Sequence, residues 1–321
     1  MNRRELILVG GAVAAARPLR AQQPRRIGFL RLAPPDATQL ADFRAGLEEA
    51  GYAEGRNLVI EYGYADGDYN RLPELAADLV RQNVEVVVTA GATDAVRAAM
   101  RATSTIPIVG TSVQPGISSS APLVEHFNRP EGNVTGVSLG GDLTPKRMQV
   151  LAEMVPGAVI GVLMNPTLTQ HKQIQEAIEE AGRTLSVKLV IATVSADADL
   201  DPAFASLAGQ HVGAIIPEAE PFLGNSWRRL VLLADRYKIP MMQEWRDAVV
   251  GGGLISYAPS LRWVYRQTGN YAGQILNGAK PADLPVIAPT RIELVINLKT
   301  ANALGLAIPY TLLGRAGEVI E

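Results

Sequence analysis

The sequence predicts an α/β protein made of two doubly wound parallel-sheet lobes joined by a multi-strand hinge. Short β-branched runs alternate with longer segments of helical periodicity through most of the 321 residues. A loop rich in Gly, Pro and Ser at 115–122 and a Gly-Gly turn at 140–141 interrupt this alternation, which then resumes. The chain is also longer than the ~250–300 residues at which a single core stops growing, so we expect two lobes.

The first unit is expected to hold five strands, each a short apolar run. These runs are 26–32, 58–62, 84–89, 106–111 and 134–138. Apolar spacing predicts helices over 36–50, 72–82 and 92–102, and Gly51 ends the first of them. The run 84–89 is apolar except for Glu85 and the final Thr89, and such a run is typical of a strand buried on both faces. This β-α-β-α order predicts a parallel sheet.

The second unit begins with a predicted helix over 144–155, with Pro145 in its first turn, where proline is tolerated. The alternation then continues through 159–164, 168–185, 187–194, 203–208, 213–217, 227–237 and 240–243. The last segment holds a short strand at 254–256, a helix at 261–276, a Pro-rich stretch at 281–289, a strand at 293–297 and a helix at 299–304. We expect lobe 1 at 22–138, lobe 2 at 139–255, and a return segment at 256–321 that forms the hinge and completes lobe 1.

The N-terminus is typical of an export signal over residues 1–21. Arg3 and Arg4 precede an apolar run at 6–16 that is too short to span a bilayer, and Ala21 offers a small residue for cleavage. The paired arginines also fit a twin-arginine signal. The alternative is a short N-terminal helix of the folded domain. Because the chain has no cysteine, it cannot carry a lipid anchor on an N-terminal cysteine, so we expect a periplasmic protein without a direct membrane anchor.

Charge and cysteine content exclude several classes of function. Residues 1–21 hold four arginines and one glutamate, so removing this net +3 from the chain's −2 leaves −5. A mildly acidic protein is not expected to bind nucleic acid, which needs a basic surface. The absence of cysteine excludes disulfides, thiolate catalysis and zinc–thiolate sites.

The motifs of common enzymes are missing. The sequence contains no Gly-x-Gly-x-x-Gly after the first expected strand, no phosphate-binding P-loop and no Gly-x-Ser-x-Gly elbow. The three histidines, His126, His171 and His211, form no His-x-x-x-His pair for a metal. A catalytic triad assembled in space stays open at this stage. We nevertheless expect no catalytic residue, no metal and no cofactor.

Candidate ligand-binding residues follow the expected strands, because open α/β sheets bind ligands beyond the carboxyl ends of their strands. They are Thr93, Thr111, Ser112, Asn165, Glu218, Glu244 and Tyr257. Thr93 begins a helix, where free N–H groups favour an acid group of the ligand. Glu218 or Glu244 is expected to hold a cationic or hydroxyl group.

Five of the candidates also have a structural alternative. Thr93 can cap its own helix, and Asn165 precedes a proline in a turn. Glu218 can belong to a solvated acidic loop with Glu220. Glu244 can pair with Arg246, while Tyr257 can serve as a hinge residue.

Several strings resemble the tryptophan/tyrosine-type substrate-binding proteins of ABC transporters. They occur, in the family's order, at 51–57, 71–73, 105–109, 128–136, 280–285 and 295–301. The likeness covers about residues 25–321 and implies a periplasmic-binding-protein-like fold of type I. It also implies a ligand held between the lobes, with an ABC permease and its ATPase as partners. The family's usual acidic stretch after the strand at 106–111 is replaced here by 113–116, and its usual Ala-Asp-Pro-Phe becomes Ala-Glu-Pro-Phe at 219–222.

Together these observations predict the periplasmic solute-binding component of an ABC importer, which closes on an amino acid or a related carboxylate. Two alternatives remain from the residues themselves. One is an α/β enzyme that acts on a small molecule, which turnover of a compound would reveal. The other is a bilobed ligand-sensing regulator, which would need a basic DNA-binding segment before the first lobe.

Overall fold

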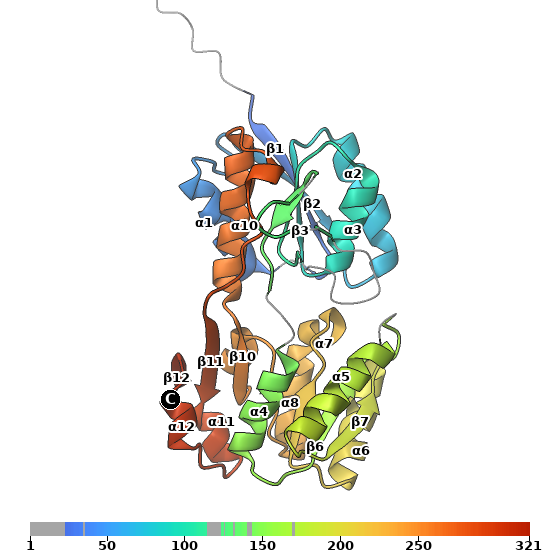
Figure 1. Ribbon diagram of the computed structural model, residues 1–321, viewed down its shortest axis with the longest axis vertical. Helices are drawn as coiled ribbons and strands as arrows, with labels where there is room; N and C mark the ends of the chain where they lie inside the picture. The colour runs from blue at the N-terminus through green and yellow to red at the C-terminus, as the bar shows by residue number, and fades with distance from the viewer. Residues whose placement is uncertain are drawn as a thin grey trace, which may run out of the picture.

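The computed structural model of the protein describes residues 23–34, 36–113, 123–124, 126–130, 132–139, 143–168 and 171–321. Two α/β lobes are stacked along the long axis of the molecule, each with helices packed around a sheet (Figure 1). The predicted fold class is therefore confirmed. The expected export signal lies outside the described residues, as do the predicted loop at 115–122 and the glycine turn at 140–141.

The first lobe holds a five-stranded parallel sheet in the order β2-β1-β3-β4-β5. Its strands are β1 (Arg25–Arg31), β2 (Leu58–Tyr64), β3 (Val86–Ala90), β4 (Ile108–Gly110) and β5 (Val134–Gly136). The helices around it are α1 (Ala37–Glu49), α2 (Leu72–Arg81), α3 (Thr93–Ala102) and α10 (Leu261–Leu276), with short 3₁₀ turns at η1 (Tyr69–Arg71) and η2 (Pro281–Asp283). Helices α1 and α10 cover one face and α2 and α3 the other, which explains why β3 is buried at every position (Figure 1).

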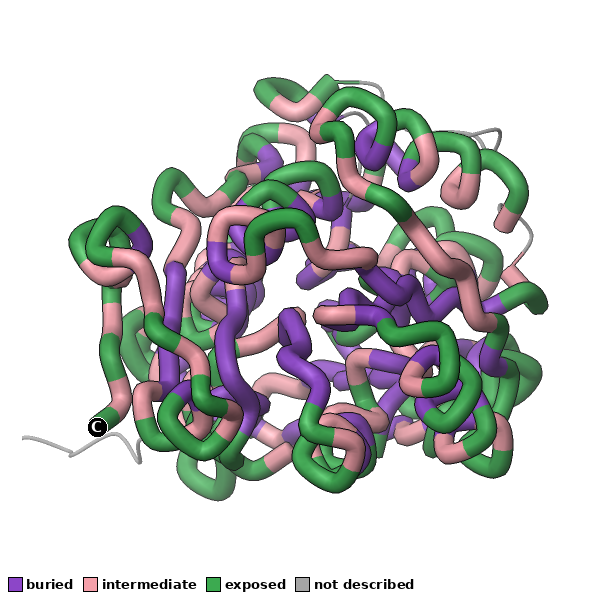
Figure 2. The backbone as a smooth tube through the Cα atoms, turned by 90° about the horizontal axis from the view of Figure 1, so that it is seen from below, coloured by how far each residue is buried: buried purple, intermediate pink, exposed green. Residues whose placement is uncertain are grey.

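The second lobe holds the strands β7-β6-β8 and β12-β11-β10-β9, which a bridge between Ile215 and Met241 joins edge to edge. Its strands are β6 (Ile160–Met164), β7 (Leu189–Thr193), β8 (Ala214–Pro217), β9 (Met242–Gln243), β10 (Ile255–Pro259), β11 (Ile292–Asn297) and β12 (Glu318–Ile320). Its helices are α4 (Thr144–Met154), α5 (His171–Thr184), α6 (Asp197–Gly209), α7 (Pro221–Asn225), α8 (Trp227–Tyr237), α9 (Arg246–Val250), α11 (Leu298–Ala303) and α12 (Tyr310–Leu313). Only β10 and β11 pair antiparallel among these described strands. Seen from below, buried stretches run through the interior while exposed residues gather on the outer turns (Figure 2).

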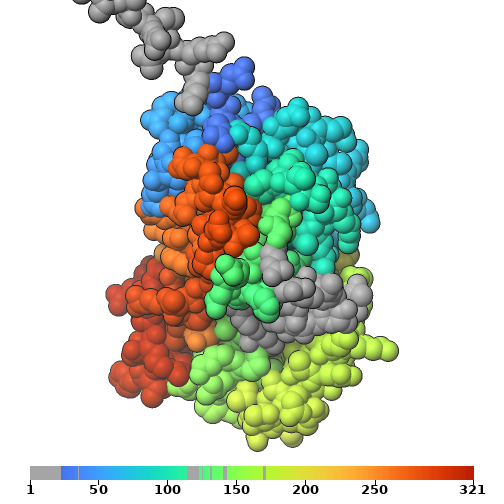
Figure 3. Space-filling view, turned by 45° about the horizontal axis from the view of Figure 1, so that its top comes forward, coloured from blue at the N-terminus to red at the C-terminus, as the bar shows by residue number. Residues whose placement is uncertain are grey.

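The chain passes between the lobes three times, after residue 138, between β10 and α10, and before β11. The first and third passages run side by side, because Ser138 N donates to Ile287 O at 2.7 Å and Val137 bridges to Ile287. The segment 256–321, expected to complete lobe 1, is shared: α10 and η2 lie on the upper lobe, whereas residues 292–320 lie on the lower one (Figure 3). The reason is the pairing of β11 with β10, which draws the C-terminal residues into the second sheet.

Helices α1 and α10, distant in the sequence, pack with their backbones in close approach. A Cβ on Gly46 would collide with the carbonyl of Arg266, and one on Gly269 would collide with the carbonyl of Phe43. Glycine at both positions therefore permits the contact that fixes α10 on the first lobe. This contact also holds the start of α10, where the chain has just left the second lobe.

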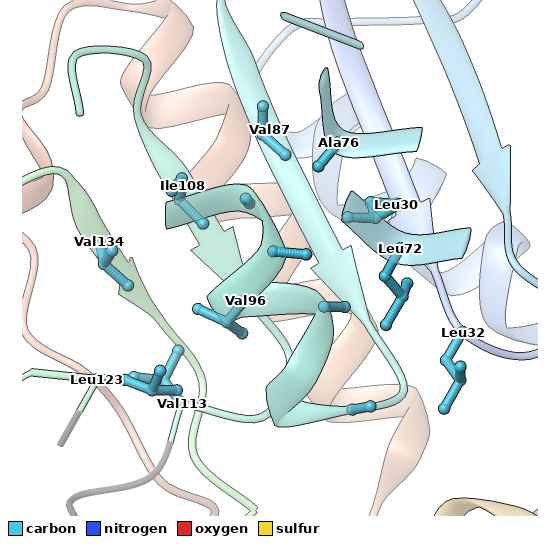
Figure 4. Close-up of a cluster of buried hydrophobic side chains, with 14 of the residues drawn as sticks. Leu30, Leu32, Leu72, Ala76, Val87, Val96, Ile108, Val113, Leu123 and Val134 are labelled. Atoms are coloured by element: carbon cyan, nitrogen blue, oxygen red, sulfur yellow. The ribbon is translucent and has the colours of Figure 1, made fainter. Parts of the chain in front are cut away.

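The core of the first lobe lies on both faces of its sheet. Between the sheet and helices α2 and α3, buried aliphatic side chains such as Leu30, Val87 and Ile108 meet Leu72 and Val96 (Figure 4). Fully burying one such side chain is worth roughly 1.5–3 kcal/mol. Two further clusters fill the second lobe, one of which includes residues of both α4 and β11. Each lobe thus has a core of its own that supports the polar groups at its facing edge.

The secondary structure departs from the sequence prediction mainly in short elements. Helices α7, α9 and α12 and strand β12 were not predicted, because they have three to five residues and show no periodicity. Helix α6 begins at Asp197 rather than near 203, because the Asp199 carboxylate accepts the N–H groups of Ser195 and Ala196 and so closes the helix start.

Candidate functional site

The carboxyl ends of the strands in the two lobes face each other. Strand β1 runs down from the N-terminal end of the upper lobe toward the lower lobe, and α7, which follows β8, lies at the top of the lower lobe (Figure 1). Tyr69 of η1 lies close enough to Glu220 for that carboxylate to affect the pKa of its hydroxyl. Burial is the largest cause that raises this pKa, and the negative charges of Glu220 and Asp94 raise it further. Glu220 belongs to the second lobe, so residues after β2 in the first lobe lie near residues after β8 in the second.

Three of the predicted residues lie at the edge of the first sheet. Thr93 is half-buried and is the first residue of α3, and the preceding Ala92 has no side-chain oxygen to cap that helix. Thr111 is buried, and its Oγ1 accepts the N–H of Gly91 at 3.3 Å. Ser112 follows it and is half-buried. The uncapped start of α3 is therefore an electropositive point at this edge.

Two more predicted residues, Asn165 and Glu218, meet at the edge of the second sheet. Glu218 is 4% exposed, and its Oε2 accepts the backbone N–H of Asn165 at 3.0 Å. The other carboxylate oxygen, Oε1, is buried and has no hydrogen-bond partner among the described residues. Burial raises the pKa of Glu218 to about 7, against the opposing hydrogen bond from Asn165, and the neighbouring Glu220 raises it further.

Asn165 also has the turn-forming role that was its structural alternative. Its Oδ1 accepts from the N–H and the hydroxyl of Thr167, at 3.0 and 2.7 Å, as in a turn-forming asparagine. Its Nδ2 lies 3.5 Å from Glu220 Oε2. Glu220 itself is buried and caps α7 by accepting the N–H groups of Phe222 and Leu223.

Glu244 lies beyond the end of β9, in the same acidic region. Its alternative partner is not Arg246, which pairs with Glu318 instead. The nearest cation is Arg147 of α4, whose Nη2 lies 3.9 Å from Glu244 Oε1. Burial raises the pKa of Glu244 to about 7, although Arg147 opposes this rise. Glu220 acts in the same direction as burial, so these carboxylates share one electrostatic environment.

Tyr257 occupies a different position from the predicted one. It lies within β10 rather than after a strand, because β10 extends from Ile255 to Pro259. Its side chain packs against the core cluster of the second lobe. Its carbonyl oxygen accepts the Nε of Arg147 at 2.8 Å, so Arg147 connects the first helix after the hinge to the strand that leads back through it.

The sequence analysis did not single out Arg31, the last residue of β1. This side chain is 5% exposed, and its Nε and Nη1 have no hydrogen-bond partner among the described residues. Its guanidinium lies over the ring of Tyr265 in α10, 5.9 Å from the ring centre. An arginine inside the apolar run 26–32 was the available signal, because a charge at the end of a buried strand needs a partner.

The facing edges thus differ in charge. The upper edge offers the uncapped start of α3 and the guanidinium of Arg31, while the lower edge offers three carboxylates. The described residues include no group of three His, Cys, Asp or Glu side chains suited to a metal ion. The arrangement can hold a small molecule that carries an acidic group at one end and a cationic or hydroxyl group at the other.

The family model named "ABC transporter substrate binding protein" matches residues 36–320, nearly the whole described chain. The chain belongs to this substrate-binding family. Its resemblance to the family, predicted from sequence strings, is therefore confirmed. No helix in the described part of this substrate-binding protein combines the length and apolarity needed to cross a membrane.

Relatives of this substrate-binding protein come from several bacteria. A curated "Tyrosine-binding protein" of Clostridioides difficile is 25% identical over 289 residues, which cover 88% of this chain and 82% of the relative. A crystal structure of an "ABC domain in complex with L-Trp" from Streptococcus pneumoniae is 26% identical and has a TM-score of 0.81, covering 93% of this chain and all of that one. A "conserved domain protein" from Vibrio cholerae is 27% identical with a TM-score of 0.82, covering 92% of this chain and all of that one.

Proposed function

We propose that this substrate-binding protein is exported to the periplasm, where it binds one amino acid or related carboxylate between its lobes and delivers it to an ABC importer. The observation that carries this proposal is the contrast between the facing edges: hydrogen-bond donors at the upper edge and buried carboxylates at the lower one. An amino acid has complementary charges within a few ångströms of each other. The permease and its ATPase are the proposed protein partners.

The upper edge supplies the site for the ligand's acid group. Ala92 does not cap α3, so the first N–H groups of this helix, beginning with Thr93, are available to oxygen atoms of a ligand. The positive end of the helix dipole adds to their attraction for an anion. Ser112 adds a hydroxyl at the same edge, whereas Thr111 contributes by holding the N–H of Gly91.

The lower edge supplies the site for the ligand's amine. Glu218 is buried with one oxygen unpartnered, and a buried carboxylate without a full set of partners costs free energy. A ligand ammonium that donates to Glu218 Oε1 would remove this cost. Glu244 lies in the same acidic region and offers a second acceptor. Asn165 positions Glu218 through its backbone N–H.

The three passages between the lobes support closure by bending. Three parallel connections resist twisting and leave the lobes free to approach or separate about the line that joins them. Arg147 couples this hinge to the site, since it contacts both the Tyr257 carbonyl of β10 and Glu244. A ligand that bridges the edges would favour the closed form, which is the form proposed to dock on the permease.

The comparisons support this ligand class. The relatives named above include a tyrosine-binding protein and a protein solved with L-Trp. Because these relatives are only about 25% identical to this chain, the side chain of the bound amino acid depends on residues that this chain does not share with them. We propose binding without chemical conversion, in keeping with those relatives.

A thermal-shift screen followed by calorimetry tests the proposal. The purified protein is mixed with the twenty amino acids, aromatic carboxylates and uncharged sugars. A ligand that binds only the native state at 100 times its Kd adds about 2.7 kcal/mol, which raises Tm by several degrees. We expect a shift with amino acids or related acids and none with sugars. A shift with sugars alone, or chemical turnover of the ligand, would overturn the proposal.

A further inference from the structure

We infer that Arg31 binds the anionic group of the ligand and thereby restricts this protein to carboxylates. The inference rests on the proposed function and makes it more specific, because it assigns the ligand's negative charge to one named side chain. Thr93 and the start of α3 attract any polar oxygen, charged or neutral. A guanidinium, in contrast, discriminates strongly between a carboxylate and its uncharged amide.

The position of Arg31 places it at the facing edge of the first lobe. It is the last residue of β1, whose carboxyl end points toward the second lobe (Figure 1). Its neighbours across the sheet are Tyr64 at the end of β2 and Ala90 at the end of β3. Gly91 follows Ala90 with a φ of +85°, and a Cβ built on it would lie 4.0 Å from Arg31 Cγ. Arg31 therefore lies beside the turn that leads into α3.

Two buried arginines of this protein differ sharply in how they are satisfied. Arg147 is 4% exposed, donates from Nε to the Tyr257 carbonyl at 2.8 Å and has Glu244 as a counter-charge. Arg31 is equally buried at 5% exposed, yet no ion pair of the described residues includes it and two of its nitrogens have no partner. A buried cation in this state lacks the partners that normally offset its desolvation. A ligand anion would supply them.

The surroundings of Arg31 favour an anionic group of the ligand. The guanidinium lies over the Tyr265 ring, a contact that holds its plane. Tyr64 is close enough for the charge of Arg31 to lower the pKa of its hydroxyl, against the larger effect of burial. The unpartnered Nε and Nη1 lie on different edges of the guanidinium, so each offers a separate buried N–H group to an oxygen of the ligand's anionic group. Acidic groups occupy the opposite lobe, so the ligand's cationic end would point away from Arg31.

The test compares acids with their amides on the full protein and two variants. The probes are L-tyrosine with L-tyrosinamide and L-tryptophan with L-tryptophanamide, because each pair differs only in the acid group and keeps the amine. The variants are Arg31→Gln and Arg31→Lys. Arg44→Gln is the matched control, since Arg44 also lies over a tyrosine ring, at 6.0 Å, but is paired with Glu54 on the outer surface.

We expect the wild type to bind each acid more tightly than its amide. In R31Q the ratio of the amide Kd to the acid Kd should fall at least about 30-fold, as expected when a buried charge partner is removed. R31K should retain part of the preference, because it keeps the charge without the fixed, planar array of donors. R44Q should behave as wild type. Wild-type binding of the acids with full preference retained in R31Q would overturn the inference and leave the proposed function standing.

Stability without ligand gives an independent readout. A ligand-binding Arg31 is not optimised for stability, so ligand-free R31Q should unfold at the same or a higher temperature than wild type. A drop in Tm larger than that of R44Q would show that Arg31 has a structural role and would overturn the inference. If no acid binds to the wild type, the proposed ligand class fails and the role assigned to Arg31 fails with it, whereas acid binding with unchanged preference in R31Q overturns the role of Arg31 alone.

Discussion

Replacing Glu218 with glutamine should stabilise this protein at neutral and alkaline pH. Glu218 is 4% exposed, and its pKa is raised from 4.5 to about 7, mainly by burial. At about 1.4 kcal/mol per pKa unit, the ionised carboxylate costs the native state about 3 kcal/mol. Glutamine has nearly the same shape, keeps an oxygen to accept the N–H of Asn165, and carries no charge.

The pH window follows from the direction of this shift. Because the folded-state pKa lies above the unfolded one, the native state binds more protons between pH 4.5 and about 7. The contribution of Glu218 to stability is therefore fully present below pH 4.5 and is lost as pH rises through about 7. E218Q cannot lose this contribution. We expect no difference between the two proteins at pH 4.5 and a gain for the variant of up to about 3 kcal/mol at pH 8.

Chemical denaturation at pH 5 and pH 8 measures this gain. Glu85→Gln is the matched control, because Arg25 lowers the pKa of Glu85 through a surface hydrogen bond and ion pair, so its removal should not stabilise at pH 8. The reasoning is refuted if E218Q is no more stable than wild type at pH 8, or if its advantage is the same at both pH values. E218Q should also bind amine-bearing ligands more weakly than wild type, even though it is more stable.

Two further substitutions test the packing and the hinge. Gly46→Ala should destabilise by about 2 kcal/mol or more, since its Cβ would collide with the backbone of Arg266, whereas Gly209→Ala, which meets no atom within 4 Å, should be neutral or stabilising; thermal unfolding compares them. Arg147→Gln should cost about 3 kcal/mol in urea denaturation, because it removes the nearest cation from Glu244 and the donor from the Tyr257 carbonyl. A loss below about 1 kcal/mol would contradict the role assigned to these two contacts.

Helices and strands long enough to show a periodic pattern could be predicted from the sequence. The run 84–89 predicted a buried strand, which the structure has as β3, and the helical spacing after Asp36 predicted α1, whose start this residue caps. Short elements such as α7 escaped prediction because five residues show no periodicity, yet α7 is where Glu220 is held. The destination of the C-terminal residues was also missed, because strand pairing between β10 and β11 depends on contacts that local patterns do not contain.

The sequence by itself indicated where candidate site residues lie, namely after buried strands, because parallel strands present their carboxyl ends at one edge of a sheet. It did not single out Arg31 or Glu220. It could name Glu218 and Asn165 without revealing that the backbone of one holds the carboxylate of the other. Only the tertiary structure decided which charges have partners. Arg31 and Arg147 are both buried arginines, but Arg147 has Glu244 and the Tyr257 carbonyl within reach, whereas Arg31 lacks partners for two nitrogens. The physical reason is that the free energy of a buried charge depends on groups brought within a few ångströms by folding, and these groups are distant in sequence.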